Sequence, residues 1–253
     1  MNDIQFISAP TPIERRAVVV HEGGLGDTCC AESTFLSIRS QYSSHITATG
    51  NSKYLNLFPQ YFDEIKDISE GIVLPVNCLA IVIAKSKLYR EMNLGFFVES
   101  FSDKQIGDET VEGYQLRQLA QYNIEAQRKE IIPNIKKRVF LNLCPSTSLK
   151  KMWEEDRFYK LADMLSSKGI NSSFIFPEMD LTDIKDMFLS GGVFVSNDSG
   201  LAHLAGAMGV YTVCMFNSEF MPPMWRTRGV GVQYASDTIP SVEEVALHIE
   251  GII

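Results

Sequence analysis

The stretch that decides the fold is Val193–Asn217, which reads VFVSNDSGLAHLAGAMGVYTVCMFN. Its apolar start predicts a strand, the small residues after Ser199 predict a helix, and the residues after Gly209 predict a second strand. Either Asp198 or Ser199 can cap this helix. Because the first amides of a helix have no partner within it and form the positive end of its dipole, we expect an anion there, typically a phosphate.

Two side chains at this helix have an ordinary structural explanation as well. Asp198 can be a helix cap and nothing more, and His203, one turn inside the helix, can be a buried side chain whose hydrogen bonds are satisfied. The local sequence does not separate these explanations from ligand binding. Other parts of the chain therefore have to decide.

A second informative stretch follows the apolar run Ala17–His21 and contains Gly24 and Gly26. Glycines let the backbone approach a ligand closely. However, Cys29 stands where a dinucleotide fingerprint requires Gly or Ala, and the next strand, His45–Thr49, ends without an acidic residue. No Gly-Lys-Ser/Thr follows the glycines either. We therefore expect neither nicotinamide or flavin binding nor a Walker-type phosphate loop.

Asp27 lies between these glycines and a helical pattern that runs to about Tyr42. One interpretation is that it caps this helix. The other is that it faces the carboxyl ends of the strands, where open α/β sheets bind their ligands, and acts as a general base. The local sequence fits both.

The third stretch is Leu141–Trp153, LNLCPSTSLKKMW, in which a strand ends at Pro145. The hydroxyls of Ser146 and Thr147 and the cation of Lys151 follow directly, and such groups bind oxyanions. The alternative for Lys151 is a solvated surface lysine, as most lysines are. A helix is expected from about Glu154 to Lys168.

Taken together, the three stretches resemble glycosyltransferase family 9, the ADP-heptose:lipopolysaccharide heptosyltransferases and their relatives. That family has a Gly-Asp pair after its first strand, a Lys-x-Trp element opening its second domain and an Asp-Ser/Thr-Gly-x-x-His-Leu signature near its end. In this chain they are Gly26-Asp27, Lys151-x-Trp153 and Asp198–Leu204, in the expected order. The resemblance covers nearly the whole chain.

The resemblance implies an α/β fold of the GT-B-like class, with two Rossmann-like domains facing across a cleft. The alternating strands and helices of the sequence also favour mostly parallel sheets. We expect residues 1–132 to form an N-terminal, acceptor-side domain and residues 133–253 to form a C-terminal, nucleotide-sugar-binding domain.

The implied activity is inverting transfer of a sugar, heptose in the family, from a nucleoside-diphosphate sugar to a glycan or other hydroxyl acceptor. ADP is the favoured nucleotide, lipopolysaccharide biosynthesis is the implied process, and neither a metal nor a cofactor is required. Asp27 would be the catalytic base, with Gly24 and Gly26 in its loop. The residues expected to bind the donor and its phosphates are Ser146, Thr147, Lys151, Asp198, Ser199, Gly200 and His203.

The chain also departs from the family. At 253 residues it is shorter than typical members. We expect that a strand–helix unit of the family is absent before the Asp198 signature. Glu178 is the counterpart assigned to the glutamate that contacts the nucleotide ribose, and Glu154 replaces a proline. Two other functions therefore stay open: a non-catalytic nucleotide-sugar-binding module and a sugar-nucleotide epimerase on a GT-B-like fold.

The composition and charge argue against several classes of protein. A net charge of −8 argues against a nucleic-acid partner and against a strongly phosphorylated acceptor. No apolar run reaches the length of a membrane span, and the sequence begins without the apolar core of a signal peptide. The five cysteines are odd in number and lack metal-ligand spacing, so we expect reduced thiols. We expect a cytoplasmic protein, either unattached or peripheral at the inner face of the membrane.

Overall fold

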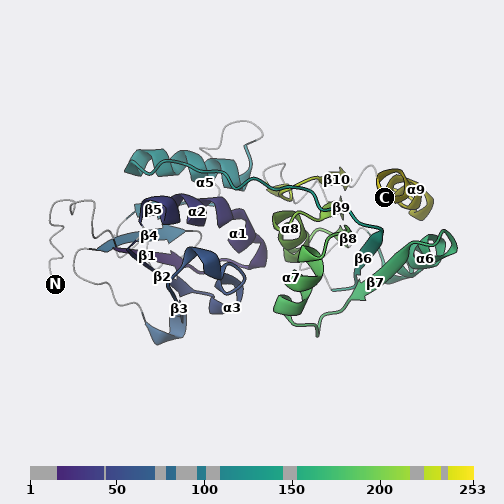
Figure 1. Cartoon of the computed structure of the whole chain (residues 1–253), viewed down its shortest axis with the longest axis horizontal. Helices are drawn as coiled ribbons and strands as arrows, with labels where there is room; N and C mark the ends of the chain where they lie inside the picture. Colours follow the sequence, from purple (N-terminus) through teal and green to yellow (C-terminus); the bar gives the residue numbers. More distant parts are fainter. Residues whose placement is uncertain are drawn as a thin grey trace. The chain divides into compact units, whose positions relative to one another are not determined.

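The computed structural model describes residues 16–42, 44–71, 78–83, 96–100, 109–144, 153–216, 225–234 and 239–253. The contacts within the chain divide it into two compact units, Met1–Lys129 and Glu130–Ile253. Within these described residues, each unit contains one five-stranded sheet, and all the paired strands are parallel. Figure 1 shows the first unit in purple to teal and the second in green to yellow.

The sheet of the first unit has the order β3-β2-β1-β4-β5. Its strands are β1 (Arg16–His21), β2 (His45–Gly50), β3 (Glu64–Asp67), β4 (Cys78–Ile83) and β5 (Phe96–Val98). From β1, the chain adds β2 and β3 on one side of the sheet and then β4 and β5 on the other side. The direction in which strands are added therefore reverses between β1 and β4. In open α/β sheets, ligands bind at the carboxyl ends of the strands beside such a reversal. The loop that follows β1, which contains Gly24 and Asp27, starts at this position.

The described helices of the first unit are short. They are α1 (Leu25–Cys30), α2 (Glu32–Gln41), α3 (Ser52–Leu55) and α5 (Val111–Leu119), with the 3-10 turns η1 (Pro59–Tyr61), η2 (Ile68–Glu70) and η3 (Ala120–Tyr122). The single helix expected after β1 is interrupted at Ala31, which ends α1 and precedes α2. Figure 1 shows α2 and α5 running side by side, and Thr34 of α2 donates a hydrogen bond of 3.3 Å to the Gln115 side chain of α5.

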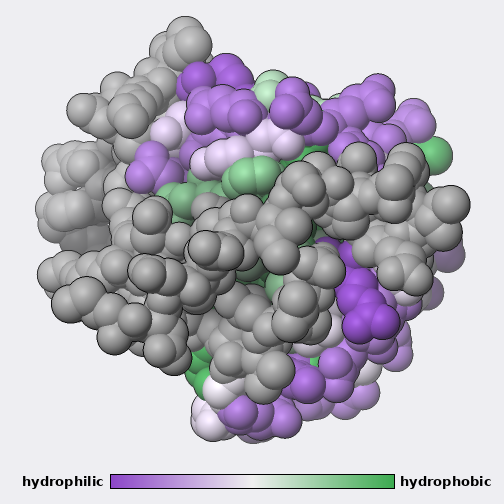
Figure 2. All heavy atoms as spheres, turned by 90° about the vertical axis from the view of Figure 1, so that its left-hand side faces the viewer, coloured by the Kyte–Doolittle hydropathy of each residue, from purple (hydrophilic) through white to green (hydrophobic). Residues whose placement is uncertain are grey.

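Successive side chains of β1 point to opposite faces of the sheet. On one face, the His21 ring lies edge-on against Phe35 of α2, with 5.8 Å between ring centroids. On the other face, Val18 and Val20 form a smaller buried cluster with Val82 of β4. In the view of Figure 2, hydrophilic residues lie along the top, right and bottom of the described surface, and smaller groups of hydrophobic residues lie between and beside them.

The sheet of the second unit has the order β10-β9-β8-β6-β7. Its strands are β6 (Arg138–Asn142), β7 (Asn171–Ile175), β8 (Val193–Asn197), β9 (Tyr211–Met215) and β10 (Gly231–Tyr234). Here the strand order reverses between β6 and β8. The carboxyl ends of these two strands therefore form the corresponding ligand-binding position of the second unit.

Helices cover both faces of this second sheet. They are α6 (Glu155–Ser167), α7 (Leu181–Leu189), α8 (Gly200–Ala207) and α9 (Val242–Ile252). Figure 1 shows α6 and α9 on one side of the sheet and α7 and α8 on the other. The buried residues Leu161 and Leu165 of α6 and Val245 and Ile249 of α9 belong to one core cluster. Only β7 and α7 stand between α6 and β8, so a single strand–helix unit precedes the Asp198 signature.

No helix in the described ranges combines the length and the apolar character that crossing a bilayer requires.

Candidate active site

The junction between β8 and α8 is the centre of the site in the second unit. The chain leaves the sheet at Asp198, whose backbone N–H donates to the carbonyl of Met215 on β9 at 2.9 Å. Ser199 is the residue that caps α8, because its Oγ accepts a hydrogen bond of 3.3 Å from the backbone N–H of Ala202. Of the two candidate caps, the structure therefore selects Ser199.

Asp198 is partly buried at this junction. Burial raises the pKa of its carboxyl group to about 6, so the group is still mostly ionised at pH 7. The pKa of the buried Cys214 thiol is raised well above its usual value, by burial and by the charge of Asp198. A carboxylate with reduced solvation beside the start of a helix is well suited to accept hydrogen bonds from ligand hydroxyls.

Gly200 and His203 have different positions on α8. Gly200 is its first residue. The His203 side chain is buried, and its ring lies edge-on to Trp225 with 6.4 Å between centroids. His203 thus contributes to packing around α8, and a supporting role toward the loop or the phosphate stays a prediction.

A polar cluster lies behind the cap of α8. The side-chain amide of Asn142, at the end of β6, donates to Ser196 Oγ at 2.8 Å and lies 3.4 Å from Ser199 Oγ. The two serine hydroxyl oxygens are 3.1 Å apart. Neither Asn142 nor Ser196 was predicted as a site residue. The available signal was polar residues that follow the apolar runs of residues 139–141 and 193–195.

Trp153, the aromatic residue of the Lys-x-Trp element, is an anchor of the fold. Its side chain has no exposed surface, its indole N–H donates to the carbonyl of Pro240 at 3.1 Å, and its ring packs edge-on against Phe158. Its backbone N–H donates to Asn197 Oδ1 and its carbonyl accepts from Asn197 Nδ2, both at 2.8 Å. The predicted phosphate-binding residues Ser146, Thr147 and Lys151 lie outside the described residues.

Glu178 lies in the turn after β7, at the carboxyl edge of the same sheet, and is exposed. Burial and the charge of Glu178 both raise the pKa of Cys144, which follows β6. The structure therefore places Glu178 at the sheet edge that also carries Asp198. Its contact with a nucleotide stays a prediction.

The junction between β1 and α1 is the corresponding position in the first unit. Asp27 is the third residue of α1, is 8% exposed, and accepts a hydrogen bond of 3.0 Å from the Gly24 backbone N–H. A Cβ atom on Gly23 would lie 2.5 Å from the Cβ of Asp27, so a glycine is required there. Gly26, the second residue of α1, lies next to Asp27. The capping interaction considered for Asp27 is therefore present.

His21, at the end of β1, is fully buried beside this loop. Its Nε2 lies 3.0 Å from Thr28 Oγ1 and its Nδ1 lies 3.3 Å from the carbonyl of Ile83. Burial lowers its pKa to about 4, although the charge of Asp27 acts in the opposite direction. The imidazole is neutral at pH 7 and supplies no positive charge for a phosphate. The sequence did not lead us to predict His21 as a buried neutral residue of this loop, although a histidine at the end of an apolar strand was a visible signal.

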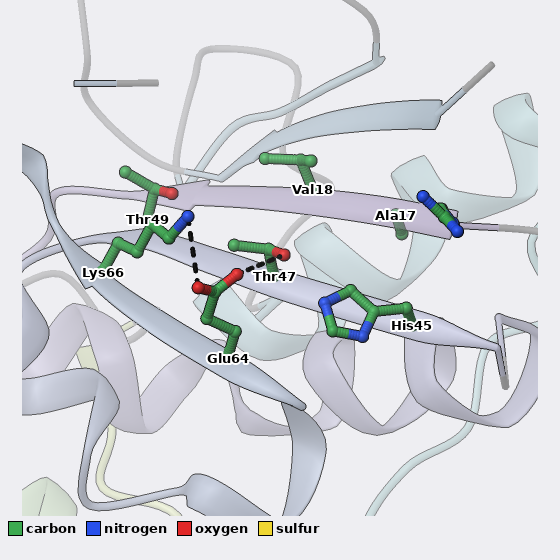
Figure 3. Close-up of a pocket in the computed structure, with 8 residues that line it drawn as sticks. Ala17, Val18, His45, Thr47, Thr49, Glu64 and Lys66 are labelled. Carbon is green, nitrogen blue, oxygen red and sulfur yellow. Dashed lines mark hydrogen bonds and ion pairs between the residues drawn. The ribbon is translucent and has the colours of Figure 1, made fainter. Parts of the chain in front are cut away.

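A pocket in the first unit lies away from these junction residues (Figure 3). It is lined by Arg16, Ala17, Val18, His45, Thr47, Thr49, Glu64 and Lys66. Figure 3 shows Lys66 and Thr47 pointing toward Glu64, at 3.2 Å and 3.3 Å from its carboxylate oxygens. The Glu64 and Lys66 charges thus already pair with each other, and no predicted site residue contributes to this pocket.

In the parts of the chain that the structure describes, no group of three or more His, Cys, Asp or Glu residues could hold a metal ion. None of the five cysteines, all of them described, forms a disulfide.

The comparison with family models gives one match. The model of glycosyltransferase family 9 (heptosyltransferase) matches residues 171–236, which run from β7 to just beyond β10 and include the Asp198–Leu204 signature. No curated protein is similar enough in sequence to count as a match.

Solved structures match over nearly the full chain. A glycosyl transferase family 9 protein from Veillonella parvula has a TM-score of 0.70 at 14% identity, covering 96% of this chain and 98% of that one. E. coli heptosyltransferase WaaC with ADP has a TM-score of 0.69 at 12% identity, covering 94% and 100%. E. coli ADP-heptose lps heptosyltransferase II has a TM-score of 0.65 at 14% identity, covering 94% and 98%.

The resemblance to glycosyltransferase family 9 is confirmed. At these sequence identities the solved structures establish the fold, and the predicted GT-B-like α/β class, with two parallel-sheet units, is correct. The family match and the shared fold together support the prediction of a glycosyltransferase.

Proposed function

We propose that this chain is an inverting glycosyltransferase that moves a sugar from a nucleoside-diphosphate sugar to a hydroxyl of a glycan or lipid-linked acceptor. The observation that carries this proposal is the β8–α8 junction. Ser199 caps α8, and the partly buried carboxylate of Asp198 lies at the same junction. It lies beside helix amides that favour a phosphate.

In this proposal the second unit binds the donor. The diphosphate lies at the start of α8, near Ser199 and Gly200, and Asp198 accepts hydrogen bonds from hydroxyls of the donor sugar. Ser146, Thr147 and Lys151 complete the phosphate site, and Glu178, at the same sheet edge, contacts the nucleotide ribose.

The proposed donor is an ADP-sugar, with heptose as the first sugar to test. Support comes from the names of two matched structures, a heptosyltransferase with ADP and an ADP-heptose lps heptosyltransferase. By the same argument, we propose a role in lipopolysaccharide biosynthesis. The proposed location is the cytoplasm, including the inner face of the membrane, where a lipid-linked acceptor could be reached.

The chemistry requires one proton transfer and one displacement. Asp27 takes the proton of the acceptor hydroxyl, and the oxygen forms a bond to the anomeric carbon. The bond from that carbon to the diphosphate oxygen breaks, its electron pair stays on that oxygen, and ADP leaves. Lys151 and the first amides of α8 stabilise the charge on the leaving diphosphate, so the proposal needs no metal.

One observation favours a second candidate, a nucleotide-sugar-binding module without turnover. The Asp27 carboxylate already accepts a hydrogen bond from Gly24 N–H and is largely buried. A carboxylate with only a capping role would leave the protein without its proposed base.

The test is an assay of the purified chain with ADP-, GDP- and UDP-sugars and a lipid-linked or glycan acceptor. A transferase releases the nucleoside diphosphate and forms a product with inverted configuration at the anomeric carbon. A binding module binds one nucleotide sugar in calorimetry without releasing diphosphate. An epimerase returns an isomeric nucleotide sugar and likewise releases none. Either of the last two results would contradict the proposed function.

A further inference from the structure

Two asparagine side chains at neighbouring strand ends bind the backbone of Cys144 and of Trp153. Asn142 ends β6 and Asn197 ends β8, and these strands are paired in the sheet. Asn142 Oδ1 accepts from the backbone N–H of Cys144 at 3.0 Å. Asn197 binds both backbone groups of Trp153, at 2.8 Å each.

The Asn197 contact has the form of a pairing between two peptide groups. A carboxamide presents an acceptor and a donor side by side, as the backbone of a neighbouring strand does. No other side chain of this size offers both in the same plane. Aspartate has the same shape, but it would place an acceptor oxygen against the Trp153 carbonyl, and two acceptors repel.

The residue that Asn197 binds is itself firmly held. The Trp153 side chain is fully buried, and its indole N–H donates to the Pro240 carbonyl. In sequence, Trp153 follows Lys151 by two residues, and Asn197 directly precedes Asp198. Asn197 therefore connects the Lys-x-Trp element with the Asp198 signature, two motifs that are 44 residues apart at this bond.

We propose that Asn197 is a positioning residue for the donor diphosphate. It does not touch the ligand; by pairing with the backbone of the buried Trp153 it fixes the end of β8, which leads directly into Asp198 and Ser199 at the start of α8. This inference rests on the proposed function and adds a residue to it. Diphosphate affinity therefore depends on Asn197, whereas nucleoside affinity does not.

The test uses Asn197→Asp and a matched control, Gln118→Glu. Gln118, in α5 of the first unit, binds both backbone groups of Glu99 in the same way, at 2.8 Å and 2.9 Å. Both variants turn a carboxamide that holds a backbone into a carboxylate. Calorimetry measures the affinities for ADP and for adenosine. Exchange of the Trp153 amide is followed by NMR after selective ¹⁵N-tryptophan labelling, which labels only two residues of the chain.

We expect Asn197→Asp to accelerate exchange of the Trp153 amide. We also expect it to weaken ADP binding by about tenfold, which is near the smallest change in affinity that follows from losing a hydrogen bond to a charged group. Adenosine affinity should stay within about twofold. Gln118→Glu should change neither affinity. If Asn197→Asp does not fold, Asn197→Ser, which retains one hydrogen-bonding group, should show a smaller loss in the same direction.

Three results would overturn the inference, and they are distinguishable. Faster Trp153 exchange with unchanged ADP affinity would remove Asn197 from diphosphate binding and leave the proposed function intact. Equal losses for ADP and adenosine would indicate general damage to the site. A wild-type protein that binds ADP no better than adenosine would contradict the proposed function itself, and this inference with it.

Discussion

Each unit has an aspartate at a junction between a strand and a helix. Asp27 lies at the β1–α1 junction of the first unit and Asp198 at the β8–α8 junction of the second, and their positions relative to the helix differ. Asp27 is inside α1, at its third residue, and accepts a hydrogen bond from Gly24 at the helix start. Asp198 precedes α8, and the capping is done by Ser199. The same residue type therefore stabilises the start of a helix in one unit and directly precedes the capping residue in the other.

Burial disfavours the charged form of a side chain at both junctions, and the resulting pKa shifts have opposite directions. In the first, it lowers the pKa of His21 to about 4 and leaves a neutral imidazole beside Asp27. In the second, it raises the pKa of Asp198 to about 6 at the start of an eight-residue helix. The cation that we propose for phosphate binding, Lys151, belongs to the second unit. This difference is why we assign the donor to the second unit and the base to the first.

The largest expected effect is on turnover in Asp27→Asn. Asparagine keeps an oxygen that can accept from Gly24 N–H, so the start of α1 and the fold should persist. The loss of a general base lowers turnover by about 10²–10⁴-fold. Steady-state kinetics with the active nucleotide sugar would measure it, with the melting temperature as control. Full turnover in the folded variant would reduce Asp27 to a cap.

The next effect concerns the pH dependence of folding at the first junction. Since the pKa of His21 is lowered from 6.5 to about 4 in the folded state, the unfolded chain binds the proton first as the pH falls. The corresponding stability is complete above about pH 6.5 and is lost toward pH 4, by about 3 kcal/mol. Urea unfolding from pH 7 to pH 4 would measure it.

The pH experiment has matched variants. His21→Gln should remove that part of the pH dependence, whereas His45→Gln, at an exposed histidine, should not. Because the pKa of Asp198 is raised, its contribution changes in the opposite direction between about pH 4 and pH 6, so the comparison of variants matters more than the wild-type curve alone. An identical pH dependence for wild type and His21→Gln would show that His21 is not neutralised by burial.

Lys151→Ala sharpens the assignment of the phosphate to the second unit. Removing the cation should weaken ADP binding by about 1.5–3 kcal/mol, as expected for a charged hydrogen bond, and leave adenosine binding almost unchanged. Lys150→Ala, at the neighbouring lysine, is the control. Equal losses of ADP and adenosine affinity in calorimetry would place Lys151 outside the phosphate site.

Asp198→Asn should not destabilise the fold, because Ser199 is the cap and because the variant removes a carboxylate whose charged form is disfavoured by burial. If the carboxylate binds sugar hydroxyls, affinity for the ADP-sugar should fall by about 1 kcal/mol. Affinity for ADP should be kept or improved, since a negative charge near the phosphates is gone. Titration of both ligands would measure this. Unchanged ADP-sugar affinity would leave Asp198 without a role in the donor site.

The strands and the longer helices could be predicted because their signals are local. The run Ala17–His21 has the burial of a strand covered on both faces, and the structure extends it by one residue to Arg16. Phe158, Leu161 and Leu165 have helical spacing and are the buried residues of α6. The interruption at Ala31 was not predictable, because alanine favours helices and no glycine or proline marks the break.

The site was predictable in its residue types and less so in its contacts. Asp198 and Ser199 are nearly equal as caps by type, so only the geometry decides between them. The pairing of Asn197 with Trp153 joins residues far apart in sequence, and nothing local to either residue announces it. The neutral state of His21 depends on its complete burial, which results from tertiary packing.

The most direct test of the donor assignment is amide hydrogen exchange of the full chain with and without saturating ADP. The account predicts slower exchange at Gly200 and Leu201, in the first turn of α8, and unchanged exchange at Leu25 and Gly26, in the first turn of α1. Protection at α1 with none at α8 would contradict the account, because it would place the diphosphate in the first unit.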